Sequence, residues 1–181
     1  MPSEVIASRY AEALLGAVPD PMLMQAVNDE LQEVADIVDG HPQFKAFLEG
    51  PNIRTQDKHA LNEKLFGGKL ESITMDYLRL LIDKDRVDHL VPSSVVFRRL
   101  VEQKRNQLRV EVTTAVPLPA DMADRLKRRL DAVTSKDTIL EPKTDPRILG
   151  GVIVKFEERV IDGSIRTSLT DMKKDLMATN V

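Results

Sequence analysis

The chain has 181 residues, of which 42% are hydrophobic and 30% charged, and its formal net charge at pH 7 is −3. This length suits one domain or two small ones, and the slightly acidic charge argues against nucleic acid as the main partner. Cysteine is absent, which excludes disulfides and thiolate metal sites. No uncharged run approaches the roughly 20 apolar residues that a membrane span needs, so we expect no direct membrane insertion.

The residues up to Gln107 show helical periodicity throughout. Asp20-Pro21 marks a strong helix start, because aspartate caps a first turn and proline fits the first helical position. Gly50-Pro51 and Gly67-Gly68 are helix-breaking pairs that separate further helices. We therefore expect residues 1–107 to form a bundle of six helices.

The segment from about Leu70 to Lys84 predicts a helix with two apolar stripes. A surface helix usually has one apolar face, so this helix is either buried on both sides or presents a groove to a partner. Large exposed apolar patches are scarce, and on that ground the residues alone favour burial. One stripe consists of Ile73, Tyr77, Leu80 and Leu81, and the other of Met75, Leu78 and Ile82.

The periodicity changes from helix to strand at Leu108. Residues 108–114 alternate between apolar and polar side chains, which predicts a half-buried strand. A short strand follows at Thr138 to Glu141, and Pro142 either ends it or places it at a sheet edge. We therefore predict a mainly α protein, with a small α+β domain at 108–181 after the bundle at 1–107. The helix between the two strands has a predicted buried stripe of Met122, Leu126, Leu130 and Val133.

The stretch from Asp145 to Ser164 predicts two further short strands. Gly150-Gly151 permits backbone angles that other residues avoid, and the β-branched run after it predicts a buried strand. A second strand at Arg159 to Ile161 is closed by the turn dipeptide Asp162-Gly163, and Ser164 is placed to cap a final helix. Apolar residues of that helix recur at helical spacing: Ile165, Leu169, Met172 and Leu176.

No constellation of residues predicts catalysis. The three histidines lie apart, without a second ligand at metal-binding spacing. His59 has Asp57 and Glu63 nearby and could be a general base, but a histidine on a helix surface explains it better. Gly150-Gly151 lacks the Lys-Ser/Thr and the following helix of a phosphate loop. We expect no catalytic residue, no metal and no cofactor, and a protein that is not an enzyme.

The residues Leu149 to Lys155, followed by Val160 to Arg166, resemble the signature of the F-type ATP synthase delta subunit family, whose mitochondrial relative is the oligomycin-sensitivity conferral protein. The phrase Ser8 to Leu14 resembles the opening of the same family. The family usually has glycine where this chain has Glu157, so a wider connection between the two strands is expected here. The signature positions are Gly150, Gly151, Asp162, Gly163 and Ser164.

The resemblance implies a stator subunit that links the catalytic alpha/beta head to the b subunits of the peripheral stalk, so that proton-driven rotation is coupled to ATP synthesis. It implies a peripheral position at the cytoplasmic face of a bacterial inner membrane. It also implies that the bundle binds the N-terminal helix of an alpha subunit in a groove, which reverses the preference for burial. The residues implied for that groove are Ile6, Tyr10, Ala13, Leu14, Ile73, Tyr77 and Leu80.

The second domain is implied to bind the stalk through its final helix, at Ile165, Leu169, Met172 and Leu176, although that stripe could instead pack on its own sheet. A different class of function stays open as the alternative: a nucleic-acid or ribosome-associated module that uses the basic helices near Arg98 and Arg128. Only two tyrosines are available for base stacking, which disfavours that alternative.

Overall fold

The computed structural model describes residues 2–156 and 159–178, which fall into two compact units, one within Met1–Val101 and one within Glu102–Val181. Most of the described residues are helical, and a four-stranded sheet lies in the second unit. The change of periodicity at Leu108 falls just inside the first strand, Gln107–Thr114. The predicted departure at Glu157 lies outside the described residues.

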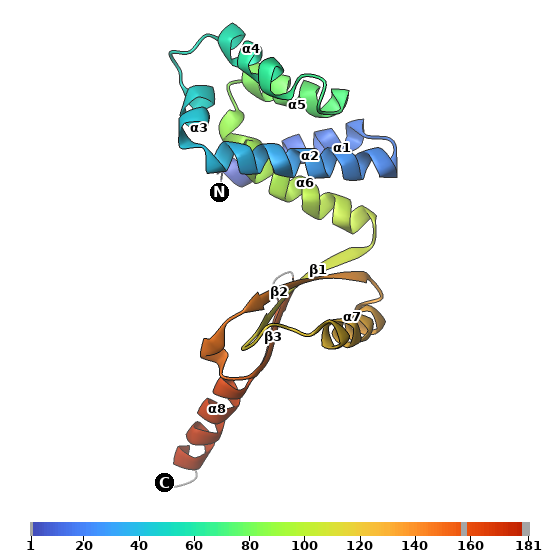
Figure 1. Ribbon diagram of the computed structural model, residues 1–181, viewed down its shortest axis with the longest axis vertical. Coiled ribbons are helices and arrows are strands. Elements are labelled where there is room, and N and C mark those ends of the chain that lie inside the picture. Colours follow the sequence, from blue (N-terminus) through green and yellow to red (C-terminus); the bar gives the residue numbers. More distant parts are fainter. Residues whose placement is uncertain (1, 157–158, 179–181) are drawn as a thin grey trace. The chain divides into compact units, whose positions relative to one another are not determined.

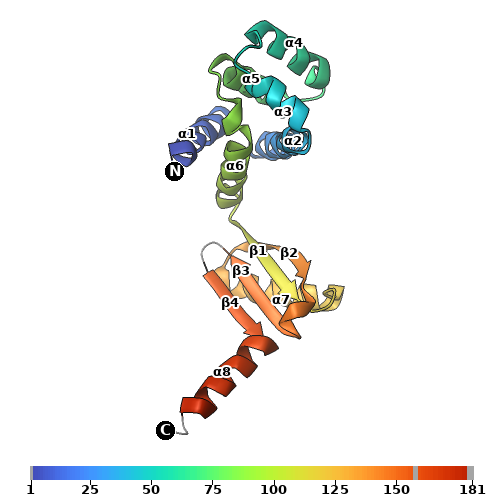
Figure 2. The same cartoon turned by 90° about the vertical axis from the view of Figure 1, so that its left-hand side faces the viewer.

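The first unit is built from helices around one apolar core. Figure 2 shows α6 between α1 and α2, while α4 and α5 lie side by side. Phe97 and Leu31 are fully buried in this core. Its elements are α1 (Pro2–Ala17), α2 (Pro21–Gly40), α3 (Pro42–Glu49), α4 (Thr55–Phe66), α5 (Ser72–Asp83), the 3-10 turn Val87–His89 and α6 (Leu90–Lys104), whose last turn belongs to the second unit.

Local chemistry explains where these helices begin and end. The Asp20 carboxylate accepts a hydrogen bond from the Met22 backbone N–H at 2.8 Å, which confirms the predicted cap of α2. Glu30 on α2 reaches across to the start of α5, where it accepts hydrogen bonds from the Glu71 N–H at 3.0 Å and the Thr74 hydroxyl at 2.5 Å. A carboxylate at a helix N-terminus satisfies unpaired N–H groups and favours the helix dipole.

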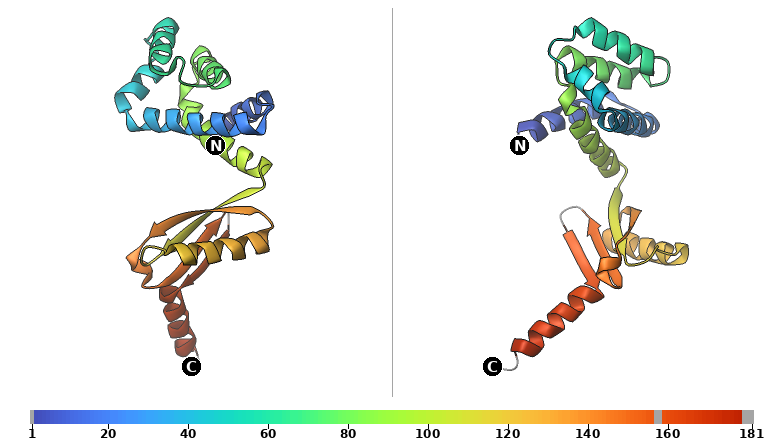
Figure 3. Two further views of the ribbon diagram at one scale, coloured as in Figure 1. Left: turned by 45° about the vertical axis from the view of Figure 1, so that its right-hand side comes forward. Right: turned by 60° about the vertical axis from the view of Figure 1, so that its left-hand side comes forward.

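The second unit is a four-stranded sheet with two helices (Figures 1 and 3). The strand order is β2-β1-β3-β4; β1 is parallel to β2, antiparallel to β3, and β3 is antiparallel to β4. The parallel pair is joined by helix α7. The elements are β1 (Gln107–Thr114), α7 (Ala120–Thr134), β2 (Asp137–Thr144), β3 (Gly151–Phe156), β4 (Arg159–Ser164) and α8 (Ile165–Ala178), with a 3-10 turn at Pro146–Ile148.

The small core of this unit lies on the face of the sheet that α7 covers. Along β1, buried side chains alternate with half-exposed ones, as the period-two pattern predicts. Leu126 and Leu130 of α7 are half-buried against the core. The core itself consists of Leu108, Val110, Val112 and Val154.

Pro142 was predicted either to end its strand or to lie at a sheet edge, and the second alternative holds: β2 continues through Pro142 because it is an edge strand and one side of its backbone needs no ladder partner. Two other local predictions need correction. β4 likewise continues through Asp162-Gly163 to Ser164 and is not closed by a turn there. Met122 and Val133 are exposed, because α7 rests on a narrow strip of the sheet and only the middle of its apolar stripe reaches the core.

Candidate interaction surfaces

The groove residues predicted on α1 and α5 divide into exposed and buried sets. On α1, Ile6 and Tyr10 are half-buried and Ala13 is exposed; on α5, Ile73 is half-buried and Leu80 is 42% exposed. Sequence reasoning missed Val5, which is 57% exposed one residue before Ile6. These side chains leave apolar area available to a partner.

Two of the residues predicted to line the groove, Leu14 and Tyr77, do not reach the surface. Leu14 is 4% exposed and Tyr77 5% exposed, and both belong to the core of the first unit. On α5, the stripe of Met75, Leu78 and Ile82 is buried throughout, whereas the other stripe has two buried members and two more accessible ones, Ile73 and Leu80. The burial that the residues alone favoured therefore holds for most of this helix.

The Tyr77 hydroxyl is held inside the unit by a short relay. It donates to Ser93 Oγ at 2.6 Å, and Ser93 Oγ donates in turn to the Leu90 carbonyl at 2.9 Å. Burial raises the pKa of Tyr77 to about 12; the hydrogen bond with Ser93 opposes this rise and the nearby Tyr10 adds to it. Tyr77 thus belongs to the core of the first unit, and Tyr10 of α1 packs half-buried against that core.

A second apolar surface lies on β4 and α8. Figures 1 and 3 show α8 leading away from the sheet and not lying across it. Three of the predicted stalk residues are exposed as a result: Ile165 at 49%, Leu169 at 54% and Met172 at 63%. The side chain of Leu176 lies outside the described part of the chain. The alternative in which this stripe packs on its own sheet does not hold for the three described residues.

The edge strand β4 carries further exposed apolar residues. Val160 and Ile161 of β4 are 59% and 56% exposed, although they point to opposite faces of the strand, and neither was predicted as a contact residue. Leu149 before β3 is 66% exposed. A free protein usually protects an apolar edge strand, so the exposed apolar residues of β4 indicate a contact surface, but only the strand order shows that β4 lies at an edge.

The signature residues join the start of α8 to the ends of the two antiparallel strands, β3 and β4. Gly151 has φ of +79°, and a Cβ there would overlap the carbonyl oxygen of Gly163. A Cβ at Gly150 would lie 2.7 Å from Cδ1 of Ile165, whose N–H donates to the Gly150 carbonyl at 3.0 Å. Ser164 Oγ accepts from the Thr167 N–H at 3.2 Å, so the predicted cap of α8 is confirmed.

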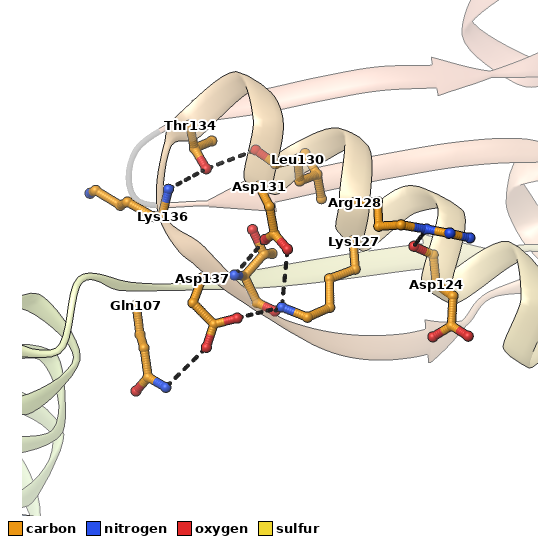
Figure 4. A network of polar contacts seen from close by, with 10 residues as sticks. Gln107, Asp124, Lys127, Arg128, Leu130, Asp131, Thr134, Lys136 and Asp137 are labelled. Carbon is orange, nitrogen blue, oxygen red and sulfur yellow. Dashed lines mark hydrogen bonds and ion pairs between the residues drawn. The ribbon is translucent and has the colours of Figure 1, made fainter.

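The other end of the sheet carries a polar network that fastens α7 to β2 (Figure 4). Lys127 Nζ donates to Asp137 at 2.5 Å, Asp131 at 3.2 Å and the Thr138 carbonyl at 2.8 Å, while Asp131 accepts from the Thr138 N–H at 2.7 Å. The hydrogen bonds that Asp137 accepts from Lys127 and Gln107 lower its pKa. Lys127, one of the basic residues of α7, is therefore held by contacts within the second unit.

The residues considered for catalysis are not assembled. The nearest carboxylate to His59 is Asp83 on α5, with Nε2 2.7 Å from Oδ1, whereas Asp57 binds Arg54 and Glu63 binds Arg79. Among residues 2–156 and 159–178, no group of three His, Cys, Asp or Glu side chains could hold a metal ion. None of the described helices is both long and apolar enough to traverse a bilayer.

The described residues form two compact units, and each unit exposes apolar side chains that a partner could cover. The family model described as the ATP synthase delta (OSCP) subunit matches residues 6–176. Similar proteins named ATP synthase subunit delta come from Anaeromyxobacter dehalogenans strain 2CP-1, 37% identical over 94% of this chain and 96% of that protein, and from Clostridium kluyveri strain DSM 555, 30% identical over 96% of each.

The fold agrees with this relationship. A chain in the cryo-EM structure of the Toxoplasma gondii mitochondrial ATP synthase hexamer matches with a TM-score of 0.71 and 20% identity, covering 94% of this chain and 97% of that one. The chain belongs to the ATP synthase delta (OSCP) subunit family. Nothing in these relationships supports the nucleic-acid-binding alternative.

Proposed function

We propose that this protein is the non-catalytic stator subunit of an F-type ATP synthase, joining the catalytic head to the peripheral stalk. Family membership over residues 6–176 is the observation that carries the proposal. A rotor that turns inside a head exerts torque on it, and ATP forms only if the head is kept from turning as well. A subunit that resists this torque needs two binding surfaces and no catalytic group.

The first unit is assigned to the head, with helices α1 to α6 as the predicted six-helix bundle. The proposed partner is the N-terminal helix of an alpha subunit, docked as an amphipathic helix on Ile6, Tyr10, Ala13, Ile73 and Leu80. Leu14 and Tyr77 support that surface from below, because both are buried. A half-buried tyrosine supplies large apolar area with little rotamer entropy to lose on binding, which makes Tyr10 the proposed anchor.

The second unit is assigned to the b subunits of the stalk. Ile165, Leu169 and Met172 present an exposed apolar stripe that their own sheet leaves uncovered. The assembly is proposed to sit at the cytoplasmic face of a bacterial inner membrane, to which this subunit is attached through its partners. This position follows from the proposed role alone.

Single substitutions on each surface test the assignment. Tyr10→Ala is expected to weaken binding of an alpha-subunit N-terminal peptide by about 1–3 kcal/mol, as for an interface anchor. Leu169→Asp is expected to leave that binding unchanged and to prevent recruitment of the stalk. Isothermal titration with the peptide and co-sedimentation with stalk subunits measure the two effects. Native circular dichroism is required of both variants, and unchanged affinity in folded Tyr10→Ala would show that the groove is misplaced.

Proton-driven ATP synthesis in membranes depleted of the delta subunit tests the function itself. Added wild-type protein is expected to restore synthesis, while residues 1–107 alone are expected to bind the head and restore none. ATP hydrolysis by the free head should continue in either case, since the catalytic residues belong to other subunits. Restoration of synthesis by residues 1–107 would disprove the division of labour between the units.

A further inference from the structure

The exposed apolar stripe of α8 is bordered by cations on one side. Arg166 and Lys173 are seven positions apart, about two turns, so they lie on the same side of the helix, and both are exposed. Lys173 follows Leu169 by four positions, which places the two cations directly beside the stripe. The opposite border holds Ser168 and, outside the described side chains, Asp175, so it carries no cation. The stripe consists of Ile165, Leu169 and Met172.

Neither cation is neutralised by its own unit. Among the described side chains, the Arg166 guanidinium and the Lys173 ammonium take part in no hydrogen bond and no ion pair. The pKa of Asp145 is lowered to about 2 chiefly by hydrogen bonds from Arg147, and Arg166 contributes least to this shift. Both oxygens of Asp145 already accept from Arg147, at 2.9 and 2.8 Å. Arg166 and Lys173 are therefore both available to a partner.

The position of these cations indicates the charge of that partner. We propose that the α8 stripe binds an amphipathic helix whose apolar face is bordered on one side by aspartate or glutamate, facing Arg166 and Lys173. The inference rests on the proposed function, in which this helix belongs to a b subunit of the stalk. Turning the partner helix end to end moves its acidic border to the other side of the stripe, away from the cations. The one-sided charge therefore also selects the direction in which the partner helix runs.

Two other occupants of the stripe fit less well. In an antiparallel pair of α8 helices from two copies, the two basic borders would oppose each other, and in a parallel pair the sequence offers only Asp175 to face them. A helix that lies on a membrane surface typically has aromatic residues on its apolar face and basic residues across its polar face. Residues 165–178 contain no aromatic residue, and Asp171 lies on the polar face.

Two neighbouring lysines provide a matched test in the full-length protein. Lys173 borders the stripe, whereas Lys174 is turned about 100° further from it and pairs with Asp171 at 3.4 Å. Lys173→Glu is expected to slow association with the soluble part of the stalk b subunits about fivefold at low salt, as for a charge that steers binding. Lys174→Glu makes the same change of charge and should slow association less than about twofold. Stopped-flow mixing measures both rates, and their difference should shrink at about 1 M salt, where charges are screened.

Model peptides test the chemistry of the partner. Three synthetic amphipathic helices share one leucine stripe and carry glutamate, glutamine or lysine along one border. The wild type is expected to bind the glutamate peptide about tenfold more tightly than the lysine peptide, with the glutamine peptide between them. The double variant Arg166→Glu/Lys173→Glu is expected to reverse that order, which a loss of folding would not do. Native circular dichroism is required of each variant.

The outcomes separate the proposal from its alternatives. Equal rates for Lys173→Glu and Lys174→Glu, or equal affinity for the three peptides, would overturn it. So would a wild-type dimer in sedimentation equilibrium, or wild-type binding to phosphatidylglycerol vesicles, that Leu169→Asp abolishes. If the wild type prefers the glutamate peptide but binds no b subunit, the preference of the stripe stands and the proposed function has failed instead.

Discussion

Replacing Gly151 with alanine is expected to destabilise the second unit selectively. Gly151 opens β3 at φ of +79°, where an L-residue costs about 1–2 kcal/mol. The added Cβ would also overlap the Gly163 carbonyl oxygen and lie 3.1 Å from Ser164 Cα. Because both neighbours are backbone atoms, the clash cannot be relieved by moving a side chain.

The size of the effect follows from these two causes. Relief requires β3 and β4 to separate near the Gly151–Ser164 pair, which forfeits about one ladder hydrogen bond, worth roughly 0.5–1.5 kcal/mol. Together with the strain at positive φ, the expected loss is about 2–3 kcal/mol. That is a large share of the 5–15 kcal/mol that typically stabilises a domain.

Gly68→Ala is the matched control. Gly68 also has positive φ, at +70°, but nothing lies within 4 Å of a Cβ built there. It should therefore lose only the strain of about 1–2 kcal/mol, and lose it in the first unit. Hydrogen exchange resolved along the chain during urea titration reads the two units separately. An effect of Gly151→Ala no larger than that of Gly68→Ala would refute the close approach of β3 to Gly163.

Three further predictions concern single groups. Tyr77→Phe should lower the stability of the first unit by about 1 kcal/mol in urea titration, because it removes the hydrogen bond to Ser93 and leaves the apolar packing in place. Gly16→Ala should raise the stability of the same unit by about 0.4–1 kcal/mol, since nothing lies within 4 Å of the added Cβ and alanine lowers the entropy of the unfolded chain. Asp145 has its pKa lowered to about 2 by hydrogen bonds from the Arg147 side chain and N–H, so the stability it contributes should be present above about pH 4 and lost as the pH falls toward 2. Thermal unfolding of wild type and Asp145→Asn should differ near pH 6 and converge near pH 2; a constant difference would contradict the assignment.

The elements could be predicted because their signals are local. The Asp20 cap, the alternation along β1 and the Ser164 cap each depend on a few neighbouring residues, and all three hold in the structure. The two alternatives for Pro142 could not be separated from the sequence, because only the strand order shows that β2 lies at an edge. Asp162-Gly163 was judged by its intrinsic preference for turns, and position at a sheet edge outweighs that preference, since a missing ladder partner costs little there.

The candidate surfaces were harder to predict because periodicity shows which residues share a face but not what covers that face. Tyr77 and Leu80 belong to one stripe, yet Tyr77 is 5% exposed and Leu80 42% exposed. Val160 and Ile161 were missed for the opposite reason, since β-branched residues in a strand are usually covered. Arg109 bonds to Glu102 and Glu141, which lie 39 positions apart in sequence, and no local pattern indicates such contacts.

Affinity and stability can be perturbed separately in this protein, because they depend on different residues. Leu169 is exposed on α8, so its substitution changes a binding surface while costing little packing. Gly151 touches only its own sheet, so its substitution changes the stability of one unit. A stator that loses coupling through weak binding will therefore recover at higher subunit concentration.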